Sequence, residues 1–179
     1  MAKRMLIISG SPRKGGNSDL LCDQFRQGAE AAGHQVEKIS LRDKRINYCV
    51  ACDACQKNGG RCVQQDDMAE VLARMIDADV IVMATPVYFY TMNAQMKTMI
   101  DRTYARYTGI SSKEFYFIMT AAVGSKSALE RTLEGFWGFT SCLNGAREMG
   151  VVFGTGAWQA GDIRKSPAMS QAFEMGNNA

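Results

Sequence analysis

Two loop segments combine residue types that suit binding of a phosphorylated ligand. The first, residues 9–18, reads Ser-Gly-Ser-Pro-Arg-Lys-Gly-Gly-Asn-Ser and joins an apolar run to a helical pattern. Such a loop presents backbone amides, hydroxyl groups and a helix N-terminus to an anion. It lacks the Lys and Ser/Thr of a Walker loop and has no G-x-G-x-x-G turn, which disfavours an ATPase or a dinucleotide-binding dehydrogenase. An ordinary strand-to-helix turn has a similar composition, so phosphate binding is a hypothesis at this point.

The second segment, residues 85–93, offers an apolar surface for a flat ring. It reads Thr-Pro-Val-Tyr-Phe-Tyr-Thr-Met-Asn and follows another apolar run. Pro86 stiffens the start of the loop, and the three consecutive aromatic residues supply a wide apolar face. The alternative is that these aromatic side chains pack under the next helix as core. Proximity of the two segments would favour a ligand with a phosphate at one end and a ring at the other.

A third segment concentrates thiols. It contains Cys49, Cys52, Cys55 and Cys62. Two successive C-x-x-C steps place three thiols within reach of one point, and the Gly59-Gly60 turn could bring the fourth back, as a 4Fe-4S cluster requires. Zinc could use the same donors, although its sites more often pair C-x-x-C steps that lie further apart. Free thiols and, in an oxidised sample, a disulfide are the other interpretations.

Alternating strand and helix patterns must position these segments. Continuous apolar runs at 4–9 and 79–85 are typical of strands buried on both faces, whereas 35–41 alternates like an edge strand. Two more strands are expected at 114–123 and 149–153. Helical spacing predicts five helices, at 18–33, 66–78, 93–107, 126–143 and 166–175.

This alternation predicts a single α/β domain over residues 1–179. We expect three layers, with a five-stranded parallel sheet and helices on both faces. Ser18 is the expected N-cap of the first helix, and Asp66 and Asp67 are expected to begin the second. Ligands of such sheets bind beyond the carboxyl ends of the strands, so the loops after the first, third and fourth strands should form the site.

Composition narrows the class of protein. The chain has 179 residues, 46% hydrophobic and 22% charged, with a formal net charge of +3. No basic cluster suggests nucleic-acid binding, and no apolar run is long enough for a signal peptide or membrane span. We therefore expect a cytoplasmic protein with reduced cysteines and no nucleic-acid or membrane partner.

The remaining cysteines and the single histidine have structural explanations. Cys22 and Cys142 fall in helical patterns and are expected to be buried apolar residues. His34 lies between the first helix and the edge strand, where a solvated loop position is expected. A Ser-His hydrolase is therefore excluded, and no protein acid or base stands out.

Together the first two segments resemble those of the flavodoxin-like NAD(P)H-dependent FMN reductases. The motifs are Gly-Ser-Pro-Arg-x-x-Gly-Asn-Ser at 10–18 and Thr-Pro-Val-Tyr-Phe-Tyr-x-Met-x-Ala-Gln-Met-Lys-x-x-Ile-Asp-Arg at 85–102. The resemblance spans nearly the whole chain and implies strand order 2-1-3-4-5, FMN as cofactor and NAD(P)H as co-substrate. It implies that the FMN phosphate is held by Ser11, Arg13, Asn17 and Ser18. It implies further that the isoalloxazine is bordered by Pro86, Val87, Tyr88 and Phe89, with a less distinctive contact at Gly124.

Other parts of the resemblance concern association. In the second motif, Lys97, Asp101 and Arg102 have helical spacing and are expected to cap, pair or face a partner subunit. The loop 154–162, which contains Trp158, is expected to form a lid or a dimer contact. A homodimer or homotetramer is what the resemblance implies.

The cysteine segment, an insertion at about 48–63, resembles the compact motif of the iron-sulfur flavoproteins, a branch of the same group. Two functions follow as expectations. The first is an FMN-dependent oxidoreductase that takes hydride from NAD(P)H and reduces a small acceptor, such as a quinone, a flavin or a metal ion. The alternative is an electron-transfer protein with FMN and a 4Fe-4S cluster at the four cysteines, exchanging electrons with a ferredoxin-like partner. A flavin-binding regulator without turnover is a third interpretation.

Overall fold

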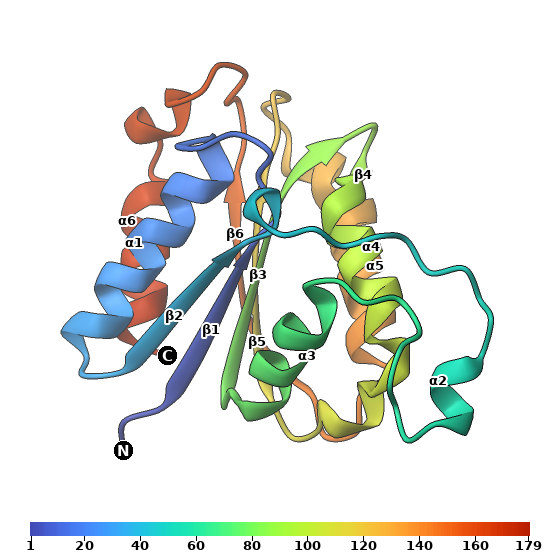
Figure 1. Cartoon of the computed structure of the whole chain (residues 1–179). Helices are drawn as coiled ribbons and strands as arrows, with labels where there is room; N and C mark the ends of the chain where they lie inside the picture. The colour runs from blue at the N-terminus through green and yellow to red at the C-terminus, as the bar shows by residue number, and fades with distance from the viewer.

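The computed structural model describes all residues from 1 to 179 and contains a parallel sheet of the predicted order. Its main strands run β2-β1-β3-β5-β6, and every neighbouring pair is parallel (Figure 1). They are β1 (Arg4–Ser9), β2 (Gln35–Ser40), β3 (Val80–Tyr88), β5 (Glu114–Thr120) and β6 (Arg147–Gly154). The expected five-stranded order is confirmed. A sixth strand, β4 (Thr91–Met92), pairs antiparallel with the end of β3 and was not predicted.

Helices cover both faces of the sheet, as expected. On one face lie α1 (Asn17–Ala31) and α6 (Ala168–Asn177), and on the other lie α3 (Met68–Asp77), α4 (Ala94–Arg102) and α5 (Glu130–Thr140) (Figure 1). Each face has its own core, of 17 buried hydrophobic residues on the α1 side and 23 on the α3 side. The central strands supply both cores because their successive side chains point to opposite faces.

Two glycines let α1 pack closely on α6. A Cβ atom at Gly28 would lie 2.0 Å from the carbonyl oxygen of Phe173, and one at Gly176 would lie 2.1 Å from that of Phe25. No larger residue fits at either position without moving the helices apart. This contact fixes α1, whose N-terminus lies at the carboxyl edge of the sheet.

Several helix boundaries differ from the predictions. Helix α1 begins at Asn17 with Gly16 at the N-cap, so Ser18 is not a cap. The pattern at 93–107 is an α-helix only to Arg102 and then continues as 3-10 turns, η2 (Thr103–Ala105) and η3 (Tyr107–Gly109). The pattern at 126–143 begins as the 3-10 turn η4 (Lys126–Leu129). Three short elements were not predicted. They are the 3-10 turns η1 (Leu41–Asp43) and η5 (Asp162–Lys165), and helix α2 (Ala54–Lys57), which lies within the cysteine segment.

The single-residue expectations had mixed outcomes. Cys22 is buried, as predicted, and burial raises the pKa of its thiol to about 12. Cys142 is exposed, so the expectation of burial was wrong, because α5 ends at Thr140 before reaching it. His34 is half-buried rather than solvated, and its Nδ1 accepts the backbone N–H of Lys3 at 3.1 Å. None of the helices has the length and apolar character needed to cross a bilayer.

Candidate functional site

A cavity of about 210 Å³ lies at the carboxyl edge of the sheet, where the topology predicted a site. Loops after β1, β3, β5 and β6 all contribute to it. Seven of the nine predicted cofactor-binding residues line it: Ser11, Arg13, Asn17, Ser18, Pro86, Val87 and Tyr88. The other lining residues are Gly16, Thr120, Ala121, Ala122, Ala157 and Trp158. The remaining two predicted residues, Phe89 and Gly124, lie outside the cavity.

The loop after β1 is compact because its own side chains brace it. The Ser11 hydroxyl donates to the Arg13 carbonyl at 2.8 Å and accepts the Arg13 N–H at 3.2 Å. A Cβ atom at Gly16 would lie 2.5 Å from the Ser11 hydroxyl oxygen, so only glycine allows this closure. The first amides of α1 follow at once, and helix-initial N–H groups have no partner within the helix.

The Ser18 hydroxyl points to a ligand. Ser18 is 1% exposed, it lines the cavity, and its Oγ has no hydrogen-bond partner. Leaving a buried hydroxyl unpaired costs about 1–3 kcal/mol, so such a group usually has a partner. Nearby Arg13 is exposed and forms no ion pair within the protein. Hydroxyl, amide and guanidinium donors together favour an anion with several oxygen atoms.

Asp19 supports this loop from behind and was missed by the sequence analysis. It is 4% exposed, and its carboxylate accepts hydrogen bonds from the Ser9 hydroxyl at 2.9 Å and the Gly15 N–H at 3.1 Å. Lys38 lies 2.8 Å away. Burial by itself would raise the pKa of Asp19, but the hydrogen bond and charge of Lys38, with the two other donors, hold it below the ordinary value. The sequence signal that could have identified Asp19 was an acidic residue in the first turn of a predicted helix.

Asn17 has a role other than the predicted phosphate contact. Its amide nitrogen donates to the carbonyls of Ala157 and Gln159 at 3.2 and 2.9 Å. Its amide oxygen accepts N–H groups from Gly161 and Ile163 at 3.0 and 3.3 Å. These four contacts use the hydrogen-bonding groups of the side chain within the protein. Asn17 therefore lines the cavity and holds the loop after β6 in place.

Asn93 joins the two loops that the sequence analysis singled out, although it was predicted only as the start of a helix. It is 1% exposed and caps α4, accepting the Met96 N–H. Its amide nitrogen donates to the Gly10 carbonyl, and its oxygen accepts from the Thr85 hydroxyl at 3.0 Å. A buried cap thus couples the ends of β1 and β3. In the sequence, a single Asn before a helical pattern predicts the helix cap, but it does not predict the bond of that side chain to the loop after β1.

The three aromatic residues form a hairpin tip rather than core. Val87 pairs with Met92 and Tyr88 with Thr91, which leaves Phe89 and Tyr90 as a two-residue turn. Both have positive φ, 48° and 65°, a conformation that favours Asn or Gly. The side chain of Phe89 therefore faces solvent at 99% exposure, whereas Tyr88, 44% exposed, lines the cavity. The strained turn lies next to the site, as such turns often do.

The loop after β5 contributes at a different point from the one predicted. Thr120, Ala121 and Ala122 line the cavity, whereas Gly124 is exposed and has open space around it. The backbone N–H of Ala121 bonds to the Gly154 carbonyl at 2.9 Å, and that of Ala157 bonds to the Ala121 carbonyl at 2.9 Å. This pairing holds the first residues of the loop at the strand end and leaves the later ones outside.

The four thiols of the cysteine segment are not gathered at one point. Cys49 and Cys52 are exposed, Cys55 and Cys62 are partly exposed, and no group of three or more His, Cys, Asp or Glu side chains is close enough to hold a metal ion. Three of the sulfur atoms do accept N–H groups. These come from the Ala51 backbone to Cys49 at 3.5 Å, from the Gln56 amide to Cys55 at 3.8 Å and from the Arg102 guanidinium to Cys62 at 3.5 Å.

A buried ion pair holds the base of this segment. The Arg102 guanidinium bonds to both carboxylate oxygens of Asp66, at 2.7 and 2.9 Å, and the two side chains are 2% and 0% exposed. Arg102 also donates to the Asn47 carbonyl at 2.6 Å, so it ties the start of the segment to its end. Burial favours the neutral carboxyl, but Arg102 and the backbone amides of Asn47 and Met68 hold the pKa of Asp66 below its ordinary value. Asp66 does lie at the start of α3, as predicted, and accepts the Met68 N–H at 3.2 Å, but its pairing with Arg102 was not predicted.

Comparison with known proteins gives this site its context. Residues 3–164 match the model of the family described as NADPH-dependent FMN reductase. The chain belongs to the NADPH-dependent FMN reductase family. An iron-sulfur flavoprotein of Archaeoglobus fulgidus is 44% identical over 95 residues, which are 53% of this chain and 43% of that protein. The iron-sulfur flavoprotein MJ1083 of Methanocaldococcus jannaschii is 41% identical over 100 residues, 56% of this chain and 51% of the relative. The chain thus spans about half the length of the curated relatives that it matches.

Solved structures agree on the fold. The Trp repressor binding protein from Bacillus subtilis has a TM-score of 0.70 and 26% identity, with 97% of this chain and 99% of that chain covered. An azoreductase from Bacillus anthracis has a TM-score of 0.75 at 16% identity, with both chains covered completely, 100% each. The three-layer, flavodoxin-like architecture of this chain is therefore shared with both of these proteins.

The cavity residues fit the FMN that the family implies. The unpaired Ser18 hydroxyl, the α1 amides and Arg13 match the donors that a phosphate requires. A volume of about 210 Å³ suits the phosphate-bearing end rather than the complete cofactor, since sites for drug-sized ligands run to about 300–1,000 Å³. The exposed rings of Tyr88 and Trp158 border its open side, where a flat ring system would lie.

Proposed function

We propose that this protein is an FMN-dependent oxidoreductase that takes hydride from NAD(P)H and reduces a small acceptor, such as a quinone, a free flavin or a metal ion. The observation that carries the proposal is the buried, unpartnered Ser18 hydroxyl in the wall of a cavity formed by the ends of four parallel strands. Membership of the FMN reductase family supports it. FMN, when bound, supplies the hydride and electron chemistry of the reaction.

The chain itself contributes binding, orientation and shape. The phosphate would be held by the Ser11 and Ser18 hydroxyls, Arg13 and the first amides of α1. The ring would be bordered by Pro86, Val87 and Tyr88 on one side and by Trp158 on another. Asn17 and Asn93 are positioning residues, because they hold the surrounding loops together. No side chain is assigned as acid or base.

The direct test combines FMN binding with protein stability in the variant Ser18→Ala. We expect FMN affinity to fall by about tenfold, because one donor to the phosphate is lost. The free protein should become more stable by roughly 1 kcal/mol, because an unpaired buried hydroxyl is removed. Flavin fluorescence titration and urea unfolding measure the two effects, and Ser170→Ala, on the exposed face of α6, is the control. If FMN does not bind the wild-type protein, the proposal is wrong.

Turnover and acceptor are tested together. Oxidation of NADH and NADPH by the FMN-loaded protein should be measured with a quinone, free FMN and ferric citrate as acceptors. Turnover with any of them supports the proposal over a flavin-binding regulator, which would show none. The preferred acceptor is the one with the highest kcat/KM.

A second candidate function is electron transfer through FMN and a 4Fe-4S cluster. Two observations favour it: three of the four sulfur atoms of the cysteine segment accept N–H groups, and several relatives that match are named iron-sulfur flavoproteins. The four thiols suit a cluster in number and chemistry, but the segment would have to close to bring them together. A ferredoxin-like electron partner belongs to this second proposal.

Iron and sulfide analysis after anaerobic reconstitution separates the two functions. Four iron atoms per chain, lost in Cys52→Ser but kept in Cys142→Ser, would favour the electron-transfer function. Absence of iron after strictly anaerobic reconstitution would exclude it.

A cytoplasmic location and a homodimer or homotetramer remain part of our proposal. Light scattering of the FMN-loaded protein tests the oligomeric state.

A further inference from the structure

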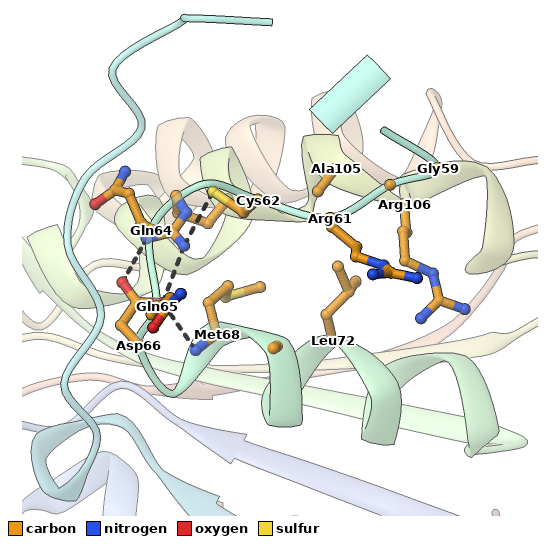
Figure 2. Close-up of a pocket in the computed structure, with 13 residues that line it drawn as sticks. Gly59, Arg61, Cys62, Gln64, Gln65, Asp66, Met68, Leu72, Ala105 and Arg106 are labelled. Carbon is orange, nitrogen blue, oxygen red and sulfur yellow. Dashed lines mark hydrogen bonds and ion pairs between the residues drawn. The ribbon is translucent and has the colours of Figure 1, made fainter. Parts of the chain in front are cut away.

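A second cavity, of about 530 Å³, lies beneath the cysteine segment and shares no residue with the FMN cavity. Its floor is α3 and its wall is the turn η2 with the residue that follows it, while residues 59–62 form the roof (Figure 2). Met68 and Leu72 project from α3 toward the space and are 2% and 4% exposed, so the apolar floor consists of the small accessible parts of these side chains together with the exposed Ala69 (Figure 2). A volume of this size accommodates a small organic molecule.

The lining of this cavity carries uncompensated positive charge. The lining contains three guanidinium groups, of Arg61, Arg102 and Arg106, and one carboxylate, that of Asp66. The charge of Asp66 is compensated by Arg102 in the buried pair described above. Neither Arg61 nor Arg106 forms an ion pair anywhere in the protein. The surplus of two positive charges therefore lies on these two arginines.

The fold brings the two arginines together despite their like charge. Figure 2 shows Arg61 and Arg106 at one end of the cavity, with Cys62 and Asp66 at the other. The close approach depends on Gly60, which has φ +82°. A Cβ atom there would lie 2.5 Å from Cγ of Arg106 and 3.0 Å from the Ala105 carbonyl oxygen. Two unpaired like charges in the lining of one cavity favour an anion as ligand, because an anion bound between them offsets their repulsion.

The third arginine of the lining does not share this role. Arg102 is 3% exposed and is bonded to Asp66 and Cys62 at the other end of the cavity, so the accessible unpaired guanidinium groups are those of Arg61 and Arg106. Guanidinium groups match the oxygen geometry of phosphate and carboxylate groups, and a phosphate monoester places nearly two negative charges at one point.

We propose that this cavity binds a small organic phosphate monoester, with its phosphate between Arg61 and Arg106 and its apolar body on Met68 and Leu72. This is a site separate from the FMN phosphate site. The same chemical group occurs on simple phosphate esters and on the 2′-phosphate of NADPH, so the experiment includes an arm for each source.

The experiment uses the full chain saturated with FMN, so that the strand-end cavity is filled and cannot take up phosphate. Isothermal titration calorimetry measures binding of phenyl phosphate, inorganic phosphate, NADP⁺ and NAD⁺. We expect phenyl phosphate to bind with a dissociation constant below about 1 mM, and inorganic phosphate to bind more weakly because it does not contact the apolar floor. Binding should weaken as salt is added.

Variants assign the binding to this cavity. In Arg61→Gln and in Arg106→Gln we expect about tenfold weaker binding of phenyl phosphate, with an unchanged melting temperature because both side chains are exposed. Arg131→Gln, an exposed and unpaired arginine on α5, should bind like the wild type. Loss in the two cavity variants alone supports a site for free phosphate esters. If instead the two variants abolish only a preference for NADP⁺ over NAD⁺, the proposal stands and the source is the dinucleotide.

Two outcomes would overturn the proposal. One is the absence of binding by both phenyl phosphate and NADP⁺, and the other is equal weakening in all three arginine variants. If FMN itself fails to bind, phenyl phosphate titration of the unloaded variants still tests this cavity, because Arg61 and Arg106 do not line the FMN cavity. Failure of the proposed function and failure of this inference are therefore distinguishable.

Discussion

The strand-end cavity and the cysteine segment are positioned by different kinds of contact. Around the cavity, loops that begin at the end of a strand are tied to the neighbouring strand, as Gly10 is to Ala84 of β3 and Ala121 is to Gly154 of β6. Asn17 and Asn93 add cross-links between loops that are distant in sequence. The cysteine segment extends from the body of the protein (Figure 1), and one buried ion pair, Arg102 with Asp66, holds both of its ends.

The two kinds of contact suit different functions. Many short, mutually bonded loops give a pre-formed site, which is what tight binding of a phosphate requires. The cysteine segment has fewer ties along its length, namely the bond of the Gln56 amide to the Tyr104 carbonyl at 3.0 Å and the packing of Gly60 against Arg106. Cys49 and Cys52 are exposed, whereas Cys62 is bonded to the anchor itself.

The largest expected effect comes from breaking the anchor of the cysteine segment. Arg102→Met leaves the carboxylate of Asp66 buried without its partner, so we expect the free energy of unfolding to fall by about 3 kcal/mol. Lys97→Met on the same helix removes a surface pair with Asp101, whose side chains are 58% and 45% exposed, and should change little. Urea unfolding compares the two. Equal losses would contradict the distinction between a buried anchor and a surface pair.

The cross-links of the strand-end cavity should matter more than similar contacts in the cysteine segment. Asn17→Ala removes four hydrogen bonds that hold the loop after β6, and we expect a loss of about 2 kcal/mol with faster proteolysis at residues 157–163. Asn58→Ala removes one exposed contact, to the Arg61 N–H, and should cost under about 0.5 kcal/mol. A larger loss for Asn58→Ala would reverse the comparison.

A smaller effect of opposite sign is expected at the hairpin tip. Replacing Phe89 by Asn and Tyr90 by Gly places in the turn the residues that positive φ favours, and should raise the free energy of unfolding by about 1 kcal/mol. Because the Phe89 side chain lies outside the cavity, FMN affinity should stay within about twofold. A marked loss of affinity would show that Phe89 or Tyr90 contacts the flavin ring, as the family resemblance implied for Phe89.

The smallest expected effect is in the acid dependence of stability. Asp19 in the strand-end region and Asp66 below the cysteine segment both have a pKa held below the ordinary value of 3.8. Their stabilisation is fully present above about pH 5 and is lost as pH falls below 3.8 toward the lowered pKa values. Unfolding measured between about pH 3 and 6 should show a shallower loss in Asp66→Asn than in the wild type. An identical slope would mean that Asp66 is not ionised in its pair.

The sequence predicted most of the scaffold and much of the cavity. Apolar runs such as 79–85 located the central strands, and the motifs at 10–18 and 85–102 located seven of the residues that line the cavity. These features depend on local patterns and on a topology with few alternatives. The hairpin of β3 and β4 was missed because an aromatic pair at positive φ contradicts the usual turn chemistry.

The sequence by itself determined the alternation of strands and helices, the phosphate-binding composition of the first loop and the spacing of the four thiols, since these follow from neighbours in the chain; the strand order came from the family resemblance. Only the tertiary structure decided that Asn17 and Asn93 cross-link loops, that Arg102 joins Asp66 under the cysteines, and that Arg61 and Arg106 line one cavity. Each of these contacts joins segments far apart in sequence. Their geometry depends on helix lengths and loop paths that short-range propensities do not specify.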